Sequence, residues 1–337
     1  MEERKLVTIQ KIENIEPIEG ADNIVLAQIM GWKVIVKKDG LSIGDRCVFF
    51  EVDSILPDGE PWSEFLRSKK FRIKTMKLRG VLSQGLALPM DILPEGSGPF
   101  EEGDDITELL NVKKHIPNLH DGGKNMGQAI GNFYPRAPKT DELRLQSYIK
   151  LLDEIKDLPL YYTVKCDGTS STFVYDEEFM VFSRRFRKKE DDKNIYWKVA
   201  RKYNLEEKLK LNPLMAVQGE VCGPGVQKNN LMLKDYDLFV FDVYDVANGK
   251  YLDFNGLINF CHDLDLNMVK VVDIVKDFSK FDNSLDAWLE RAKGRYDNTN
   301  KHREGIVIRP LKEKYSKVLR GRLSFKVLNN DFLLKEK

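Results

Sequence analysis

The sequence predicts an α+β protein in which antiparallel strands dominate and a small β-rich domain precedes a larger mixed one. Residues 1–110 consist of short β-branched and aromatic runs separated by Gly, Asp and Pro. Beyond residue 140, similar runs are interspersed with segments of helical periodicity, which is the pattern of an α+β domain. The length of 337 residues also favours about two domains.

The first domain, residues 1–110, is expected to be a small barrel or sandwich. Its strand-like runs are KLVTIQKI, NIVLAQIMGWKVIVK and RCVFFEVDSIL. Turn-forming residues separate these runs in EGADN, KKDGLSIGD and LPDGEP. Short strands at this spacing are typical of closed or sandwiched all-β modules.

A linker or ordered loop is expected over residues 111–139, which are rich in Gly, Pro, Asn and Lys and lack periodicity. A helix is then expected to begin at Thr140, an N-cap followed by Asp141 and Glu142, and to end before Pro159. Its apolar stripe would comprise Leu145, Tyr148, Ile149, Leu152 and Ile155.

The second domain, residues 140–337, contains both kinds of element. Strands are expected in LYYTVKC, STFVY, FMVFS, MAVQGEVC, YDLFVFDVYDV, NMVKVVDIV, EGIVIRP and RLSFKVL. Helices are expected near 194–210, 255–264 and 284–293. The last of them would be capped by Ser284 and ended by Gly294.

Composition favours an intracellular protein, in the cytoplasm or nucleus, without a membrane partner. We also expect a monomer, although composition does not bear on this. Hydrophobic residues make up 42% of the chain and charged residues 32%, and no apolar run approaches the roughly 18 residues that span a bilayer. The charged N-terminus MEERKLVTIQ lacks the apolar stretch of a signal peptide. The 4 cysteines form no CxxC pair, which fits a reducing compartment better than a disulfide scaffold or a zinc ribbon.

Positive charge is clustered, although the net charge is only +1. No acidic residue lies between Phe65 and Met90, and further basic clusters occur at 184–189 and 312–326. Such clusters indicate anion sites, with ordinary solvated faces as the alternative for any one of them. The residues of the first cluster, which we expect to contact RNA phosphates, are Arg67, Lys69, Lys70, Arg72, Lys74, Lys77 and Arg79.

Several common kinds of active site are excluded because their motifs are missing. The sequence has no GxxxxGK[ST] phosphate loop, no GxSxG elbow and no HExxH, and its 4 histidines show no metal-ligand spacing. The stretch VKCDGTSSTF, residues 164–173, instead places Lys165 at a strand end before an Asp-Gly turn. A lysine there can act as a nucleophile if its pKa is depressed, although a plain hairpin turn gives the same pattern.

Five further segments carry groups suited to nucleotide chemistry. Arginine binds phosphate in a bidentate manner, a buried carboxylate needs a partner, and an aromatic side chain can stack on a base. Phe239 and Phe241 would share one strand face, on which core packing is the alternative role. The segments are FSRR at 182–185, VQGEVCGPG at 217–225, LFVFDVY at 238–244, EGIVIRP at 304–310 and RLSFKVLNN at 322–330.

In this order and spacing, the six segments resemble motifs I, Ia, III, IIIa, IV and V of the covalent nucleotidyltransferases, which include ATP-dependent DNA and RNA ligases and mRNA capping enzymes. The resemblance covers about residues 165–330 and implies an ATP-grasp-like adenylyltransferase domain. It implies that Lys165 attacks the α-phosphate and that Lys326 contacts it, so these two would be catalytic. The implied ATP-binding set is Val164, Lys165, Asp167, Gly168, Arg184, Arg185, Glu220, Phe239, Phe241, Glu304 and Lys326.

Individual roles follow from the same resemblance. Glu220 would bind the ribose, and Phe241, or otherwise Phe239, would stack on the base. Glu304 would help to hold the metal, and carboxylates at Glu304 and Glu220 suit Mg²⁺ or Mn²⁺. Arg184, or otherwise Arg185, would contact ribose or RNA.

One position departs from the family pattern. Motif V in many relatives reads Lys-x-Lys, whereas this chain has Ser324 at the first position. Lys326 would then act alone, or Arg322 would share its work.

The first domain resembles OB-fold modules through PIEGADNIVLAQIMGWKVIVKK and MKLRGVLSQGLALP. An N-terminal OB fold before a minimal nucleotidyltransferase domain, with GEVCGPGVQKN at motif III, is similar to the Naegleria-type RNA ligases. The resemblance implies an ATP-dependent RNA ligase that joins 3′-OH and 5′-phosphate ends through a lysyl-AMP. DNA ligation, guanylyl transfer and non-catalytic RNA binding stay open as alternatives.

Overall fold

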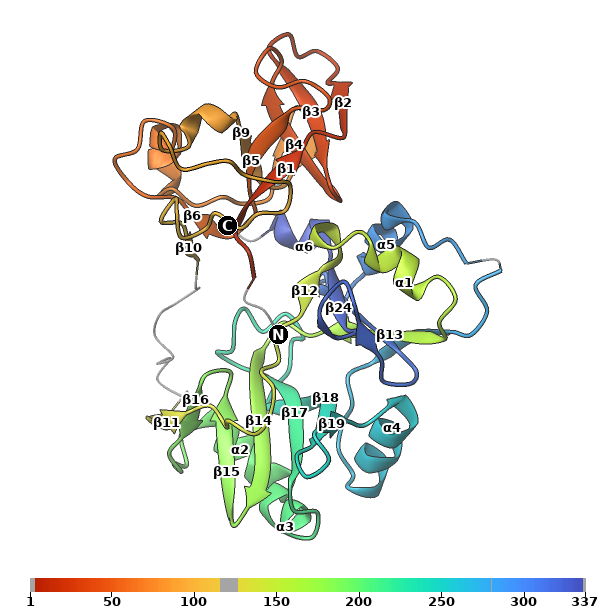
Figure 1. Cartoon of the computed structure of the whole chain (residues 1–337). Helices are drawn as coiled ribbons and strands as arrows, with labels where there is room; N and C mark the ends of the chain where they lie inside the picture. The colour runs from red at the N-terminus through yellow and green to blue at the C-terminus, as the bar shows by residue number, and fades with distance from the viewer. Residues whose placement is uncertain (1–3, 116–126, 280, 336–337) are drawn as a thin grey trace. The chain divides into compact units, whose positions relative to one another are not determined.

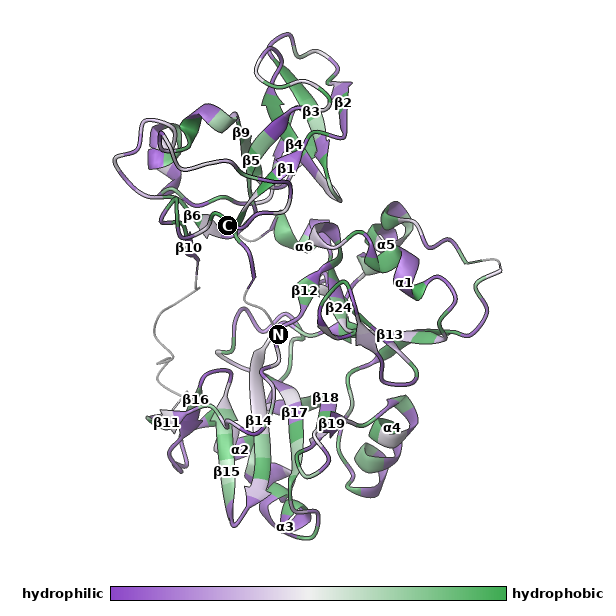
Figure 2. Ribbon diagram, viewed as in Figure 1, coloured by the Kyte–Doolittle hydropathy of each residue, from purple (hydrophilic) through white to green (hydrophobic). Residues whose placement is uncertain are grey.

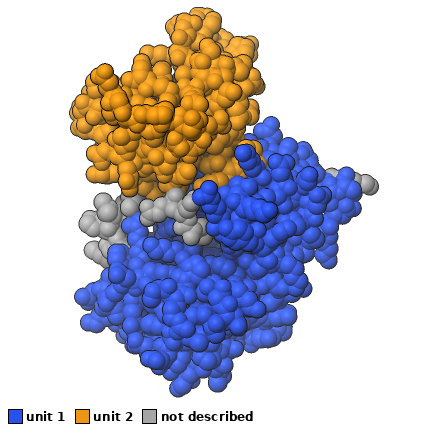
Figure 3. Space-filling model, in the orientation of Figure 1, with its two compact units in different colours: residues 1, 120–144, 150–332 blue, residues 2–119, 145–149, 333–337 orange. Residues whose placement is uncertain are grey.

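The computed structural model describes residues 4–115, 127–279 and 281–335 (Figure 1). Its contacts divide the chain into two compact units (Figure 3). One unit comprises residues 2–119, 145–149 and 333–337, and the other residues 1, 120–144 and 150–332. The expected α+β class with mainly antiparallel strands is confirmed, because every strand pair described within the sheets is antiparallel except one.

The first unit is built from short antiparallel strands around one apolar core. Strand β4(Trp32–Lys37) alternates buried and outward residues, so that Trp32, Val34 and Val36 lie in the core with Phe49 and Phe50. Two 3₁₀ helices, Glu64–Lys69 and Met90–Ile92, connect strands. The sheets are β2(Asn14–Pro17)-β3(Ile24–Ile29)-β4(Trp32–Lys37), β1(Val7–Lys11)-β5(Arg46–Phe50)-β9(Leu86–Leu88), β10(Lys113–Lys114)-β6(Ser54–Ile55) and β7(Met76–Leu78)-β8(Val81–Ser83).

The second unit contains a seven-stranded sheet covered by helices on one face. Helices α2(Ile195–Lys202), α3(Leu205–Lys210) and α4(Phe254–Asp263) pack against it, and Val199, Leu205 and Leu257 lie in the shared core (Figure 1). The strand order is β11(Ala129–Asn132)-β16(Phe186–Lys188)-β15(Glu178–Ser183)-β14(Thr169–Asp176)-β17(Met215–Cys222)-β18(Asp237–Asp245)-β19(Lys250–Tyr251).

A five-stranded sheet completes the second unit, and helix α5(Leu285–Ala292) packs on it. The Trp288 ring of α5 meets the Tyr162 ring edge-on at 5.5 Å between centroids. Hydrophobic residues, green in Figure 2, are concentrated on the strands and on the inner side of the helices. The strand order is β12(Leu143–Arg144)-β24(Phe325–Leu328)-β21(Gly305–Pro310)-β13(Leu160–Lys165)-β20(Val271–Val275). Short elements outside both sheets are the hairpin β22(Tyr315–Ser316)-β23(Gly321–Arg322), α6(Asn330–Leu333) and a 3₁₀ turn at Leu145–Ser147.

The helix expected from Thr140 is wrong. Leu143–Arg144 form β12, which pairs in parallel with β24, and α1 occupies only Leu151–Ile155. Tertiary contacts override the helical pattern here, because the side chains that would have capped the helix bind neighbouring strands. The Thr140 hydroxyl lies 2.6 Å from the Ser170 hydroxyl, and the Glu142 carboxylate accepts hydrogen bonds from Arg309 and Ser324.

The segment 111–139 contributes a strand to each unit. Strand β10 pairs with β6, and β11 pairs with β16 at the edge of the seven-stranded sheet. Residues 116–126 of this segment lie outside the described residues. The helices expected near 194–210, 255–264 and 284–293 are present, and the Ser284 hydroxyl caps α5 by accepting from the Ala287 amide.

All 4 cysteines are free and buried. Within the described part of the chain, no helix has the length and apolar character to cross a membrane.

Candidate active site

Lys165 and Glu304 meet where two neighbouring strands of the five-stranded sheet end. Lys165 is the last residue of β13, and Glu304 directly precedes β21. The register pairs Lys165 with Gly305, so the two side chains start from adjacent positions. The Lys165 Nζ lies 2.7 Å from a Glu304 carboxylate oxygen, and the two side chains are 23% and 19% exposed. The predicted nucleophile and the predicted metal ligand are therefore in direct contact.

A close backbone approach brings the KCDG turn against strand β17. A Cβ on Gly168 would lie 2.5 Å from the Val221 carbonyl oxygen and 2.8 Å from the Glu220 Cγ, so only glycine fits. Two side chains from the loop after β17 hold the turn. Asn230 Nδ2 donates to the Asp167 carboxylate at 2.6 Å, and Gln227 Nε2 donates to the Gly168 carbonyl at 3.2 Å.

Glu220 is a half-buried carboxyl group with a raised pKa. It lies on β17, opposite Ser170 on one neighbouring strand and Phe239 on the other. Burial raises the pKa of Glu220 to about 8, and the nearby Glu304 carboxylate adds to the rise, while Lys165 opposes it. The charged form of Glu220 is therefore disfavoured in the metal-free protein.

The pKa of Lys165 is shifted in the direction opposite to that required for attack. Burial works to lower the pKa of Lys165, but the Glu304 carboxylate and, less strongly, Glu220 and Asp167 outweigh it and raise the pKa above its ordinary value. The amine is thus an ammonium in this state of the protein. Negative charge around it has to be neutralised before it can act as a nucleophile.

Phe239 and Phe241 lie away from the helix-covered core of the seven-stranded sheet. Both side chains are half-buried and pack near Val164 and Cys166, whereas Val240 is fully buried under the helices. The register passes from Val240 directly to Asp242, so Phe241 is the extra residue of a β-bulge. Bulges re-aim a side chain out of the regular alternation.

Lys326 lies on the same face of the five-stranded sheet as Lys165. Its partner across β21 is Val307, which in turn pairs with Thr163, two residues before Lys165. Residues directly opposite one another, and residues two apart on one strand, project to the same face. The structure therefore places Lys326 and Lys165 on the same side of the five-stranded sheet.

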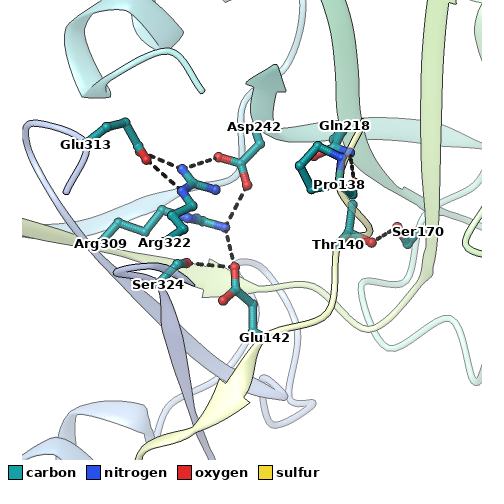
Figure 4. A network of polar contacts seen from close by, with 10 residues as sticks. All are labelled: Pro138, Thr140, Glu142, Ser170, Gln218, Asp242, Arg309, Glu313, Arg322 and Ser324. Carbon is teal, nitrogen blue, oxygen red and sulfur yellow. Dashed lines mark hydrogen bonds and ion pairs between the residues drawn. The ribbon is translucent and has the colours of Figure 1, made fainter. Parts of the chain in front are cut away.

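Ser324 and Arg322 belong to a buried polar network (Figure 4). The Ser324 hydroxyl donates to Glu142 at 2.7 Å. The Arg322 guanidinium donates to Asp242 at 2.8 Å and to Glu313 at 2.7 Å, and it lies 3.7 Å from the Tyr251 ring centroid. These contacts place the Arg322 guanidinium within the network.

Arg309 joins the same network from β21. It is 2% exposed, and its Nη2 donates to Asp242 and to Glu142 at 3.0 Å each. The network thus ties Glu142, which precedes β12, to strands of both sheets (Figure 4).

Arg184 directly follows β15 and is exposed. Its guanidinium also forms an ion pair with Asp141 in which both Nε and Nη2 donate. Arg185 is the next residue along the chain and is exposed.

The basic run of the first unit divides into paired arginines and exposed lysines. Arg67 donates to Asp58 at 2.7 Å and to Glu64, and Arg72 donates to Asp53 at 2.8 Å. Arg79 donates to the Gly20 carbonyl at 2.7 Å. The lysines Lys69, Lys70, Lys74 and Lys77 are exposed, as are Arg67 and Arg79, whereas Arg72 is half-buried.

Two residues of the site carry no motif signal. Asn230 directly follows the motif III phrase GEVCGPGVQKN, which includes Gln227, and Tyr296, which bonds the Lys165 carbonyl at 3.0 Å, lies in a stretch without a motif before motif IV. Their contacts join residues far apart in the chain, which local patterns do not encode.

The donor set fits a metal ion that is held only in part by protein. Among the described residues, no group of three or more His, Cys, Asp or Glu side chains is arranged to hold an ion. Mg²⁺ is commonly bound through one or two carboxylates, with water and phosphate oxygens as the other ligands. Glu304 and Glu220 are carboxylates of that kind.

Comparison with known proteins identifies the family. An RNA ligase family model matches residues 158–328, just over half of the chain, and an OB-fold domain model matches residues 6–90. The chain belongs to the RNA ligase family. The resemblance drawn from the motifs and the expected N-terminal OB fold are thereby confirmed.

Solved structures resemble this RNA ligase over its whole length. The Naegleria gruberi RNA ligase with PPi is 33% identical, with a TM-score of 0.88 over 99% of both chains. A lysine-to-alanine mutant of that enzyme with ATP and Mn is 32% identical, with a TM-score of 0.89 over 98% of this chain and 99% of the other. A glutamate-to-alanine mutant with AMP and Mn is 32% identical, with a TM-score of 0.89 over 99% of both. No curated protein matches the sequence.

Proposed function

We propose that this RNA ligase joins RNA ends bearing a 3′-OH and a 5′-phosphate, and that it draws on ATP through a lysyl-AMP on Lys165. The observation that carries the proposal is the 2.7 Å contact between Lys165 and Glu304 at the paired ends of β13 and β21. The similar Naegleria gruberi structures were solved with ATP, AMP and Mn, which supports ATP and a divalent cation as the reactants here.

The first step forms a bond between the Lys165 amine and the α-phosphorus of ATP. The Pα–O bond to the β-phosphate breaks, pyrophosphate leaves, and the amine loses its proton to solvent. Lys326, on the same sheet face, would contact the α-phosphate and stabilise the charge that develops on it. Glu220 would bind the ribose, because a carboxyl group with a pKa of about 8 can donate a hydrogen bond as well as accept one.

A metal ion bound at Glu304, with Glu220 nearby, would supply charge neutralisation for the phosphates. The negative charge of the Glu304 carboxylate raises the pKa of Lys165. A bound metal ion would neutralise part of that charge. The ammonium would lose its proton more readily, as attack requires. The Glu304 carboxylate thus favours the protonated form of Lys165. When a metal ion neutralises that carboxylate, Lys165 would lose its proton and become a neutral amine.

The remaining steps transfer and discharge the AMP. An oxygen of the RNA 5′-phosphate attacks the phosphorus of lysyl-AMP, the P–N bond breaks, and Lys165 regains its proton. The RNA 3′-OH then attacks the 5′-phosphorus, the new phosphodiester forms, and AMP leaves. Arg184 would contact the ribose or the RNA, and Phe241 would stack on the base from the strand face that it shares with Phe239.

The sealing activity is tested with a nicked duplex whose 3′ end is either a ribose or a deoxyribose. We expect ATP-dependent joining at the ribose end and much slower joining at the deoxyribose end. Equal rates at both ends would favour a DNA ligase, and incorporation of label from GTP in place of ATP would favour a guanylyltransferase.

We also propose that the protein acts inside the cell as a monomer. Free, buried thiols at all 4 cysteines are typical of a reducing compartment. Light scattering of the purified protein at micromolar concentration tests the monomer, and a mass of twice the chain would contradict it.

A further inference from the structure

We propose that Tyr296 is a positioning residue for lysine adenylation, because its hydroxyl fixes the backbone of both Lys165 and Glu304. The Tyr296 hydroxyl donates to the Lys165 carbonyl at 3.0 Å and accepts from the Glu304 amide at 3.1 Å. The inference rests on the proposed function, since it concerns how that reaction is set up.

The hydroxyl bridges the two strands at the point where their pairing ends. The last register pair of β13 and β21 is Lys165 with Gly305. A Cβ on Gly305 would lie 2.2 Å from the Val327 carbonyl oxygen, so the strand backbones are packed tightly there. Beyond that pair the two strands separate. There the Tyr296 hydroxyl bonds the Lys165 carbonyl and the Glu304 amide. The side chains of Lys165 and Glu304 are thereby held where they meet.

Tyr296 is itself held in place by its own segment. Arg295 and His302 form an isolated antiparallel bridge, and the Tyr296 amide donates to the Lys301 carbonyl at 3.1 Å. The Arg303 side chain closes the base of this hairpin, because its guanidinium donates to the Ala292 and Lys293 carbonyls at the end of α5. The hydroxyl is therefore positioned by α5, which packs on the five-stranded sheet.

The peptide on the other side of Glu304 is equally fixed. The Glu304 carbonyl accepts from the Asn329 amide at 2.9 Å, and the Asn329 side chain donates to the Arg303 carbonyl at 3.0 Å. Of these groups that hold the Glu304 backbone, the Tyr296 hydroxyl is the one that also reaches Lys165. It thus couples the position of the nucleophile to that of the carboxylate.

The Tyr296 hydroxyl can keep donating its hydrogen bond at neutral and moderately alkaline pH. The Tyr296 side chain is 6% exposed and packs with Val164 and Cys166. Burial, reinforced by the Glu304 carboxylate, raises the pKa of Tyr296, so the hydroxyl retains the proton that it donates. Removing the hydroxyl leaves a buried carbonyl and a buried amide without this partner, and the strand ends are free to shift.

The test is Tyr296→Phe, with Tyr162→Phe as the matched control. Both changes remove one hydroxyl from a buried tyrosine of the same unit, but the Tyr162 hydroxyl donates to Asp273 at 3.4 Å, away from Lys165. Lys165 adenylation is followed in single-turnover reactions over a range of ATP concentrations and pH. For Tyr296→Phe we expect the rate at saturating ATP to fall on the order of tenfold or more, with little change in the ATP concentration that gives half the maximal rate.

Two further readouts separate positioning from a loss of stability. The Glu304 amide should exchange its hydrogen faster in Tyr296→Phe, and the pH at which adenylation reaches half its maximal rate should move, because the spacing of Lys165 and Glu304 sets the lysine pKa. Tyr162→Phe should leave all three measurements near those of the parent. If Tyr296→Phe does not fold, site-specific difluorotyrosine at 296 keeps the hydroxyl but makes it a stronger donor. We then expect a rate change of at least about twofold, absent when the same group is placed at 162.

The possible failures are distinguishable. If the parent protein forms no lysyl-AMP, the proposed function is wrong. If the parent is adenylated and Tyr296→Phe matches it in rate and pH profile, or if Tyr162→Phe loses rate in parallel, the positioning role is wrong.

Discussion

Lys165 lies among carboxylates that favour its charged form, and this has a measurable consequence. Replacing Glu304 by Gln removes the strongest electrostatic influence that raises the Lys165 pKa, so more of the amine is neutral at a given pH. We expect Lys165 in metal-free Glu304→Gln protein to react faster than in the parent with an amine-directed reagent at pH 8–9, as measured by peptide mass spectrometry.

Glu313→Gln is the control for this change, because Glu313 pairs with Arg322 and not with Lys165. Equal labelling of Lys165 in the parent and in Glu304→Gln would show that Glu304 does not control the lysine.

Glu220 should make stability fall as pH rises. Its pKa is raised to about 8 in the folded protein, from an ordinary value of 4.5, so the folded state binds more protons than the unfolded state between these values. The stabilising contribution is therefore complete below about pH 4.5 and is lost as pH rises through about 8. Thermal unfolding between pH 5 and 8 should show a smaller decline in Tm for Glu220→Gln than for the parent. A parallel decline in both proteins would contradict the assignment.

At the scale of elements, the buried network around Asp242 holds the two sheets of the second unit together. Asp242 accepts from Arg309 and from Arg322, and both arginines are nearly buried. Asp242→Asn keeps the shape but removes the charge that compensates two guanidinium groups. We expect a loss of about 3 kcal/mol in the free energy of unfolding, measured by urea denaturation.

Asp245→Asn on the same strand is the control, because its carboxylate accepts hydrogen bonds from Asn248 in the local turn. A change there should stay below about 1 kcal/mol. Similar losses in the two variants would mean that the network adds nothing beyond a local bond.

Strands and helices whose hydrophobic residues recur with a clear period are predictable from the sequence. The exceptions have a physical cause. Helix α5 is predictable because Ser284 and Gly294 mark the two ends of one short segment. The helix expected from Thr140 failed because Thr140 and Glu142 bond to strands that are distant in the sequence. Lys165 and Glu304 were found through motifs, whereas Tyr296 was not, since its role depends on two long-range hydrogen bonds.

For the whole molecule, we propose that the first unit serves RNA binding and leaves the reaction with ATP to the second. Lys69, Lys70 and Lys74 are exposed, whereas Arg72 forms an ion pair with Asp53. Replacing the three lysines therefore tests RNA contact without breaking that ion pair. Neutralising them should weaken RNA binding for all sequences, without changing Lys165 adenylation. The log–log salt slope of binding should fall by about 0.7 for each phosphate that the protein no longer neutralises.

The matched control neutralises Lys33, Lys37 and Lys38, which are exposed in the same unit but outside the basic run. RNA titrations over a range of salt concentrations make the comparison. If both triple variants weaken binding equally, general charge is responsible and the run has no special role.

The central claim, that Lys165 becomes covalently joined to AMP, is tested most directly by intact mass after incubation with ATP and Mn²⁺. The parent protein should gain the mass of one AMP, and folded Lys165→Ala should gain none. An AMP adduct on folded Lys165→Ala, or a parent protein that takes up no AMP, would contradict the account.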